Sequence, residues 1–335
     1  MFKKIVPASK NTFESFLSGI PARDYVFQST TSYDEQIKQA AEMIKEAEYC
    51  LIGAGAGLST AAGAQYGGKF FEDNFGDFQK KYGKGPYMQD MYSAGFYPYP
   101  DEESYWGYWS KQAMKAGIEA DHTKLHKVIL DMLQGKQCFV LSTNADGQFT
   151  KAGLPEDKIF CTQGDYFHIQ CAKGCHQKTY DAVILFKQMD QARTDCRIPS
   201  DMVPKCPVCG GRMNMNLRCD QYFVEDEAWH QAESRFSDFL QNMTEAAKKG
   251  NKVVLLELGV GFNTPTIIRF PFEKLMREYD NINMIRLNLN EAVVPLSFGN
   301  RIVGINEDIS VIYMVFFVYI EDKIAEIYNI DRWIR

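Results

Sequence analysis

The sequence predicts an α/β fold: a Rossmann-like parallel sheet with helices on both faces, carrying a small cysteine-rich module and a helical insert. Three features lead to this prediction. They are an apolar strand pattern that runs into a glycine-rich turn, two pairs of closely spaced cysteines, and a segment rich in aromatic residues. The length of 335 residues suits one main domain plus one smaller module.

The glycine-rich turn follows a short strand. Residues 49–52 have the apolar character of a buried strand, and residues 53–57 (Gly-Ala-Gly-Ala-Gly) follow at once. Residues 59–63 look like the start of a helix, and residues 32–47 repeat apolar side chains at helical spacing. This layout lets backbone N–H groups meet a dinucleotide pyrophosphate, because a Cβ atom would hold the ligand away from the backbone. The alternative is a plain α/β turn with small residues for tight packing. The acidic residue expected of an ordinary dehydrogenase is not evident.

Four cysteines form two pairs on tight turns, which is what a tetrahedral structural zinc ion requires, with no open position for catalysis. Two histidines, His168 and His176, flank the first pair, but four thiolates already complete the shell, so we expect neither to be a ligand. The alternative is four buried free thiols. We predict a zinc module over residues 165–220. Its metal ligands are Cys171, Cys175, Cys206 and Cys209.

Composition and charge exclude several classes of function. A net charge of −6 argues against general affinity for nucleic acid. The longest apolar run, residues 311–320, is too short to span a bilayer and suits a buried strand or a packed helix. Nine cysteines without a secretion signal indicate a reducing compartment, and we expect the protein to be cytoplasmic.

Residues 82–109 contain ten aromatic side chains. They fall within a predicted helical insert of about residues 67–115. Such a cluster most simply packs a small helical subdomain, although it could also exclude water from a reactive site and shape an acceptor channel.

Taken together, the motifs resemble the sirtuin family over roughly residues 35–308. The resemblance implies that residues 1–164 and 221–335 form an NAD-binding domain, with NAD as co-substrate and zinc as a structural ion. It rests on Gly-Ala-Gly-Leu-Ser at 55–59, Asn-Ala-Asp-Gly at 144–147, Gln-Gly at 163–164, the two cysteine pairs, the strand and glycine loop at 253–262, and Ile-Arg-Leu-Asn at 285–288. It implies these cofactor-binding residues: Gly53, Ala54, Gly55, Ala56, Gly57, Ser59, Gly63, Asn144, Asp146, Gln163, Gly259 and Asn288.

The departures from the family pattern are as informative as the matches. Residues 63–68 read Gly-Ala-Gln-Tyr-Gly-Gly where most sirtuins have Gly-Ile-Pro-Asp-Phe-Arg, and residues 143–146 read Thr-Asn-Ala-Asp instead of Gln-Asn-Ile-Asp. Gln163 stands where sirtuins have a catalytic histidine. These changes resemble the macrodomain-linked sirtuins of microbial pathogens. That branch implies mono-ADP-ribosylation of a lipoylated carrier related to the glycine-cleavage H protein, reversal by a macrodomain hydrolase, and a role in the oxidative stress response.

The resemblance assigns catalysis to Asn144, Asp146 and Gln163. It implies that Asn144 contacts the ribose and positions a water, and that Asp146 binds the nicotinamide amide, although Asp146 could instead cap a helix. A glutamine amide cannot take up a proton near neutral pH, so Gln163 is not the base that deacylation needs, and a structural role is its alternative. Glu257 ends an apolar strand, where it would bind ribose hydroxyls or form a buried salt bridge.

Two rival functions remain at this point. One is a protein-lysine deacylase in which another group replaces the missing base, and the other is a non-catalytic sensor of NAD or ADP-ribose. Gln163 disfavours the first, and the retained Asn144 and Asp146 disfavour the second.

Overall fold

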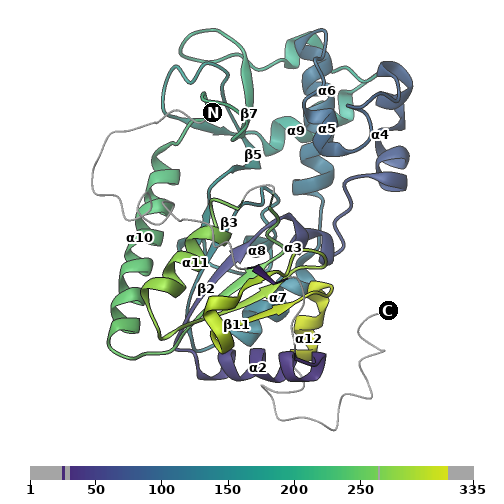
Figure 1. Ribbon diagram of the computed structural model, residues 1–335. Helices are drawn as coiled ribbons and strands as arrows, with labels where there is room; N and C mark the ends of the chain where they lie inside the picture. Colours follow the sequence, from purple (N-terminus) through teal and green to yellow (C-terminus); the bar gives the residue numbers. More distant parts are fainter. Residues whose placement is uncertain (1–24, 27–30, 263–264, 316–335) are drawn as a thin grey trace.

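The computed structural model describes residues 25–26, 31–262 and 265–315. A six-stranded sheet forms the core of the lower lobe in the view of Figure 1. Its strand order is β11-β9-β8-β2-β3-β4. Every neighbouring pair is parallel, which confirms the predicted Rossmann-like sheet. In chain order the strands are β2 (Tyr49–Ala54), β3 (Gln137–Ser142), β4 (Ile159–Cys161), β8 (Val253–Leu258), β9 (Ile282–Leu287) and β11 (Ile302–Ile305).

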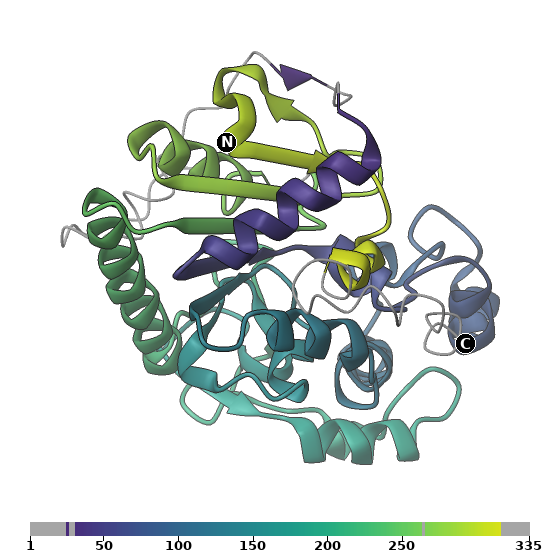
Figure 2. The same ribbon diagram turned by 90° about the horizontal axis from the view of Figure 1, so that it is seen from below.

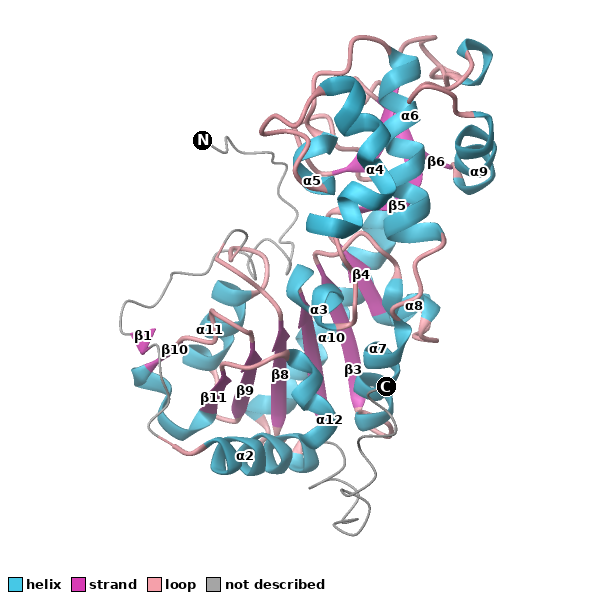
Figure 3. Ribbon diagram, turned by 90° about the vertical axis from the view of Figure 1, so that its right-hand side faces the viewer, coloured by secondary structure: helices cyan, strands magenta, loops and turns pink. Residues whose placement is uncertain are grey.

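The strand order reverses next to β2. From β2 the chain first builds β3 and β4 on one side of the sheet, and it later builds β8, β9 and β11 on the other side (Figure 3). At such a switch point the loops after the two adjacent strands run in opposite directions and leave a crevice at the carboxyl edge, where α/β proteins bind ligands. The loops after β2 and β8 therefore define the place to look for the site.

Helices cover both faces of the sheet, as predicted. Cys50 and Ile52 of β2 pack on the side of α2 (Tyr33–Glu46) and α7 (Thr123–Met132), while Leu51 packs on the side of α10 (Glu227–Lys248) and α11 (Arg269–Glu278). Adjacent residues of a strand point to opposite faces, so the fully apolar strand buries both. Figure 2 shows α2 lying along one face of the sheet.

The helix before the first strand is confirmed at residues 33–46. Ser32 caps it, since the Ser32 N–H donates to Glu35 Oε2 at 2.9 Å and the Glu35 N–H is directed at Ser32 Oγ, which is a capping box. The helix after the glycine turn differs from the prediction: α3 (Ala56–Ala61) begins three residues before Ser59. Gly55 adopts an extended conformation and serves as the N-cap, so the next residues become helical at once.

A second, antiparallel sheet has the order β6-β5-β7, with β5 (Gly164–Cys171), β6 (Thr179–Asp181) and β7 (Met213–Leu217), and α9 (Val183–Ala192) lies beside it. The helical insert consists of α4 (Gly68–Tyr82), α5 (Met91–Gly95) and α6 (Glu102–Ala113). Its aromatic residues pack a local core, as the simpler interpretation predicted. The fully buried aromatic side chains of the insert are Phe71, Phe75, Phe78, Trp106 and Tyr108.

The remaining elements are short. The apolar run at 311–320 begins as a packed 3₁₀ turn and helix, and residues 316–320 lie outside the described part of the chain. Within the described residues, no helix is long and apolar enough to cross a membrane. The short elements are β1 (Tyr25–Val26) paired with β10 (Val294–Pro295), α8 (Gln148–Lys151), α12 (Ile312–Val315), a π-helix (Met114–Ile118), and 3₁₀ helices at Glu156–Lys158, Ser200–Met202, Leu296–Arg301 and Ile309–Val311.

Candidate active site

The glycine turn lies against the loop after β8. The Gly55 N–H donates to Leu258 O at 2.9 Å, and the Gly57 N–H donates to Gly259 O at 3.0 Å. A Cβ added at Gly55 would lie 2.6 Å from Gly259 O, and one at Gly57 would lie 2.8 Å from Gly259 Cα. The glycines are thus required for the close contact between two protein loops. From the sequence we expected a different reason, namely that a Cβ atom would hold a ligand away from the backbone.

The predicted residues around this turn divide into buried and accessible ones. Gly53 and Ala54 are buried inside β2, and a Cβ at Gly53 would lie 2.3 Å from Ile268 Cγ2. Ala56 and Gly63 are exposed, and Gly63 ends the helical segment with φ +105°. The exposed residues Ala56 and Gly63 can therefore offer backbone groups to a ligand, whereas the buried Gly53 and Ala54 cannot.

A hydrogen-bonded chain joins Asn144, Ser59 and Asp146. Asn144 Nδ2 donates to Gly55 O at 2.9 Å and to Ser59 Oγ at 3.1 Å, while Ser59 Oγ donates to Asp146 Oδ2 at 2.5 Å. The Gln148 N–H donates to Asp146 Oδ1 at 3.2 Å. Asn144 and Asp146 follow β3 and Ser59 lies on α3, so the parallel sheet brings these predicted site residues together at its carboxyl edge.

Gln163 lies half-buried between β4 and β5. Its side-chain Nε2 donates to Thr162 Oγ1 at 3.1 Å, and its main-chain carbonyl oxygen accepts the Arg218 N–H at 3.0 Å. The Thr162 N–H donates to Ser142 O at 3.0 Å, which ties this segment to the end of β3 just before Asn144. The Gln163 side chain is therefore held by its neighbour, and its amide is neutral.

Sequence reasoning missed several residues around Asp146. Burial raises the pKa of the Tyr66 phenol, with a further increase from Asp146 and an opposing hydrogen bond to Ser59. Burial likewise raises the pKa of Tyr166. Burial also lowers the pKa of His126, whose ring meets Phe149 edge-on. All three side chains are thus kept neutral beside the carboxylate. Tyr66 falls in the 63–68 segment that departs from the sirtuin pattern, and that departure was the signal that could have found it.

Gly259 and Asn288 lie at the carboxyl edge of the other half of the sheet. Gly259 has φ +63°, and a Cβ there would lie 2.3 Å from Leu58 N. Asn288 Nδ2 donates to Val260 O at 3.2 Å, so its amide braces the neighbouring loop. Glu257 is fully buried in ion pairs with two arginines, which settles its alternatives in favour of the salt bridge.

The four predicted zinc ligands lie together at one end of the antiparallel sheet. Their Sγ atoms are all within 4.8 Å of one another, with 3.7 Å between Cys171 and Cys209 and 3.6 Å between Cys175 and Cys206. A tetrahedral zinc ion with Zn–S bonds of about 2.3 Å requires sulfur atoms about 3.8 Å apart, so the residues fit the ion. The separations are far too long for disulfides.

The two flanking histidines have other partners. His176 Nδ1 lies 3.1 Å from Cys175 Sγ, and its Nε2 lies 2.8 Å from the Tyr180 hydroxyl. His168 Nδ1 lies 2.9 Å from Asp165, and this hydrogen bond raises the pKa of His168. His176 thus contacts the sulfur of a predicted zinc ligand, and His168 is paired with a carboxylate instead.

The side chains at this edge of the sheet also fit NAD. Asp146 is 6% exposed, yet it has two hydrogen-bond donors where a carboxylate has about four acceptor positions, which leaves room for a carboxamide N–H. Asn144 uses both Nδ2 hydrogens on the protein and so leaves Oδ1 to accept a hydroxyl or a water.

Comparison with known proteins identifies relatives. A Staphylococcus aureus protein named protein ADP-ribosyltransferase is 33% identical over 281 residues, covering 83% of this chain and 86% of that protein. A Fusarium oxysporum protein named probable bifunctional ADP-ribose hydrolase/ADP-ribosyltransferase is 31% identical, and this chain spans 43% of its length. No protein-family model matches the chain.

Solved structures agree on the fold. A structure described as a Sir2 homologue–NAD complex has a TM-score of 0.52 at 15% identity and covers 88% of this chain and 97% of that one. Identity this low shows the fold alone, whereas the Staphylococcus aureus relative shows the family. The chain belongs to the NAD-dependent protein ADP-ribosyltransferases of sirtuin fold.

Proposed function

We propose that this protein transfers one ADP-ribosyl group from NAD to a lipoylated carrier related to the glycine-cleavage H protein, and that a macrodomain hydrolase reverses the modification. The observation that carries the transferase chemistry is the hydrogen-bonded chain Asn144–Ser59–Asp146, which polarises and orients the side chains that contact NAD. Gln163 belongs to the same site, and its amide cannot take up a proton. Transfer needs an oriented nucleophile, whereas deacylation needs the later base.

Bound NAD supplies the ADP-ribosyl group and the nicotinamide leaving group. Asp146 accepts the carboxamide N–H and so orients the ring that leaves. Asn144, with Nδ2 fixed on Gly55 O and Ser59 Oγ, presents Oδ1 to a ribose hydroxyl. The Gln163 amide donates hydrogen bonds to the nucleophile of the carrier protein, or accepts them from it, and so orients that nucleophile without removing a proton.

A lipoyl group is a long apolar arm, and the helical insert offers aromatic surface for it. The side chains of Tyr87, Tyr92 and Phe96 are 44%, 74% and 51% exposed, and the Tyr92 and Phe96 rings lie 5.1 Å apart. Apolar area of this kind binds an acyl chain by excluding water. This surface supports the choice of carrier.

Two further considerations support the proposal. The name of the Fusarium relative pairs an ADP-ribose hydrolase with an ADP-ribosyltransferase, which fits a mark that one activity adds and the other removes. None of the nine cysteines, all of which lie in the described part of the chain, forms a disulfide, which fits a reducing compartment such as the cytoplasm. A link to the oxidative stress response stays a prediction.

Nicotinamide release with NAD and the lipoylated carrier tests the site assignment. Asn144→Ala removes the bonds to Gly55 O and Ser59 Oγ, and we expect a loss of about 100-fold or more, as when one preorganised donor is removed from an active site. Asn242→Ala, an exposed asparagine on α10, is the matched control and should keep full activity. Both variants should keep their zinc. Full activity of Asn144→Ala would overturn the assignment.

A further inference from the structure

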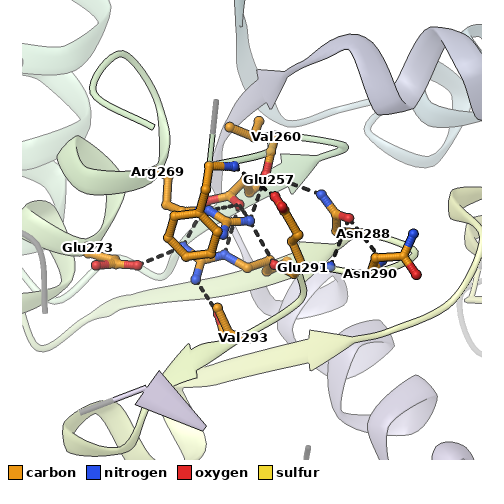
Figure 4. A network of polar contacts seen from close by, with 10 residues as sticks. Glu257, Val260, Arg269, Glu273, Asn288, Asn290, Glu291 and Val293 are labelled. Atoms are coloured by element: carbon orange, nitrogen blue, oxygen red, sulfur yellow. Dashed lines mark hydrogen bonds and ion pairs between the residues drawn. The ribbon is translucent and has the colours of Figure 1, made fainter. Parts of the chain in front are cut away.

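Four charged side chains are wholly buried between β8, β9 and α11: Glu257, Arg269, Glu273 and Arg286. Figure 4 shows Glu257, Arg269 and Glu273 within this network of polar contacts. Glu257 Oε1 lies 3.1 Å from Arg269 Nη2 and 2.8 Å from Arg286 Nε, and Glu273 Oε1 lies 2.9 Å from Arg286 Nη2. Two carboxylates balance two guanidinium groups. Each charge thus has a partner, which burial in a low-dielectric interior requires.

Arg269 also reaches beyond this network to the backbone. Its Nη2 donates to Val260 O at 2.6 Å and to Glu291 O at 2.8 Å. Val260 belongs to the loop after β8, and Glu291 belongs to the loop after β9. Hydrogen bonds from a charged donor are stronger than neutral ones, so a single guanidinium fastens the two loops to each other.

Two other contacts join the same loops. Asn288 Nδ2 donates to Val260 O at 3.2 Å, while Asn288 Oδ1 accepts the N–H groups of Asn290 and Glu291, each at 3.1 Å. The Phe262 N–H donates to Glu291 Oε2 at 2.7 Å. The Phe262 ring also lies over the Arg269 guanidinium, 4.3 Å from it, and is 39% exposed. Arg269 is thus fully buried and covered by the Phe262 ring.

The fastened loop bears directly on the glycine turn. Gly259 O accepts the Gly57 N–H at 3.0 Å, and a Cβ at Gly55 would lie 2.9 Å from Val260 Cα. Close-packed backbones leave no slack, so a shift of Val260 displaces the turn after β2. The position of Arg269 is therefore transmitted to the surface that meets the dinucleotide.

We propose that Arg269 is a positioning residue for the reaction. It holds the loops after β8 and β9 in the arrangement in which the crevice binds NAD. The proposal rests on the placement of the dinucleotide in this crevice and does not depend on the identity of the acceptor protein.

The test compares Arg269→Lys with Arg301→Lys. Lysine keeps the positive charge beside Glu257 but lacks the planar guanidinium, in which Nε donates to Glu257 while Nη2 donates to both carbonyl groups. Arg301 is a matched control, because its Nη1 also donates to main-chain carbonyls, those of Met276 at 2.8 Å and Tyr279 at 3.1 Å. It differs in position, since it directly precedes β11 at the amino edge of the sheet, opposite the carboxyl edge that holds the site. Both variants are checked for folding by their thermal midpoint and zinc content.

Arg269→Lys should weaken NAD binding, measured by calorimetry, by about tenfold or more and raise the KM for NAD to match, while kcat for nicotinamide release at saturating NAD stays within about threefold. Arg301→Lys should leave both constants within about twofold. Unchanged NAD affinity in folded Arg269→Lys would overturn the proposal. Equal weakening in both variants would also overturn it, since that indicates general destabilisation.

Should Arg269→Lys fail to fold, a double variant carries the test. Glu257→Gln with Arg269→Gln removes one charge of each sign and leaves Arg286 paired with Glu273. The same rise in the dissociation constant for NAD is expected, and unchanged affinity would contradict the proposal. NAD binding is measured without any carrier. The result for Arg269 therefore stands whether or not the lipoylated carrier proves to be the acceptor.

Discussion

At the scale of single residues, the reaction is decided by which side chains carry a proton. Asp146 accepts hydrogen bonds from Ser59 and Gln148, and Gln163 is a neutral amide anchored on Thr162. The sequence predicted this contrast because the identity of residue 163 is enough to exclude a base there. It did not predict Tyr66, whose approach to Ser59 and Asp146 depends on how residues 63–68 fold.

Restoring the histidine tests how much depends on residue 163 alone. We expect Gln163→His to give no strong deacylation of acyl-lysine peptides, because residues 63–68 have also changed and Tyr66 now lies beside Ser59. A general base contributes about 10²–10⁴-fold only when it is correctly placed. The measurement is release of acyl groups from peptides, followed by mass spectrometry. Robust deacylation by this single variant would show that the altered segment matters little.

At the scale of elements, strand and helix types were predictable and loop contacts were not. The 49–52 strand pattern and the helix at 32–47 follow from local periodicity and capping. The contact of Gly55 and Gly57 with Gly259 joins segments about 200 residues apart, and no local pattern reveals it. Asn288 was predicted to bind the cofactor, and the structure shows its amide bracing Val260. Long-range packing determines these details.

Alanine substitutions at two glycines with positive φ separate the free-energy cost of backbone strain from that of a steric clash. Gly259→Ala places a Cβ 2.3 Å from Leu58 N at φ +63°, whereas Gly250→Ala, at φ +98°, meets nothing within 4 Å. Gly250→Ala should cost only the conformational penalty, about 1–2 kcal/mol. Gly259→Ala should cost more and should abolish NAD binding, because the clash displaces the glycine turn. Chemical denaturation and calorimetry check both, and equal effects of the two substitutions would contradict the contact as described.

At the scale of the whole molecule, the zinc module and the helical insert share one core. Trp106 of α6 is fully buried, 6.1 Å from Phe186 of α9, and Glu102 of α6 pairs with Lys205 and Arg212 of the module. The cysteine spacing predicted the metal site but could not predict this joint packing, since nothing local to either segment encodes it. We therefore expect the packing of the insert to depend on the zinc module.

Removal of zinc should consequently destabilise more than the metal site. Structural zinc sites bind with on the order of 10 kcal/mol of apparent free energy that is coupled to folding. Cys206→Ser should lose zinc and show a lower thermal midpoint with reduced transferase activity. Cys219→Ser, an exposed cysteine outside the cluster, should retain one zinc per chain and an unchanged midpoint. Wild-type stability in zinc-free Cys206→Ser would contradict the structural role of the ion.

The most direct test of the proposed function is the intact mass of a lipoylated glycine-cleavage H-like carrier after incubation with this protein and NAD. Unlipoylated carrier is the control for the acceptor, and Asn144→Ala is the control for the enzyme. We expect a gain of one ADP-ribosyl group that depends on lipoylation and is lost with Asn144→Ala. An unmodified carrier, together with loss of acyl groups from acyl-lysine peptides, would contradict it and identify a deacylase.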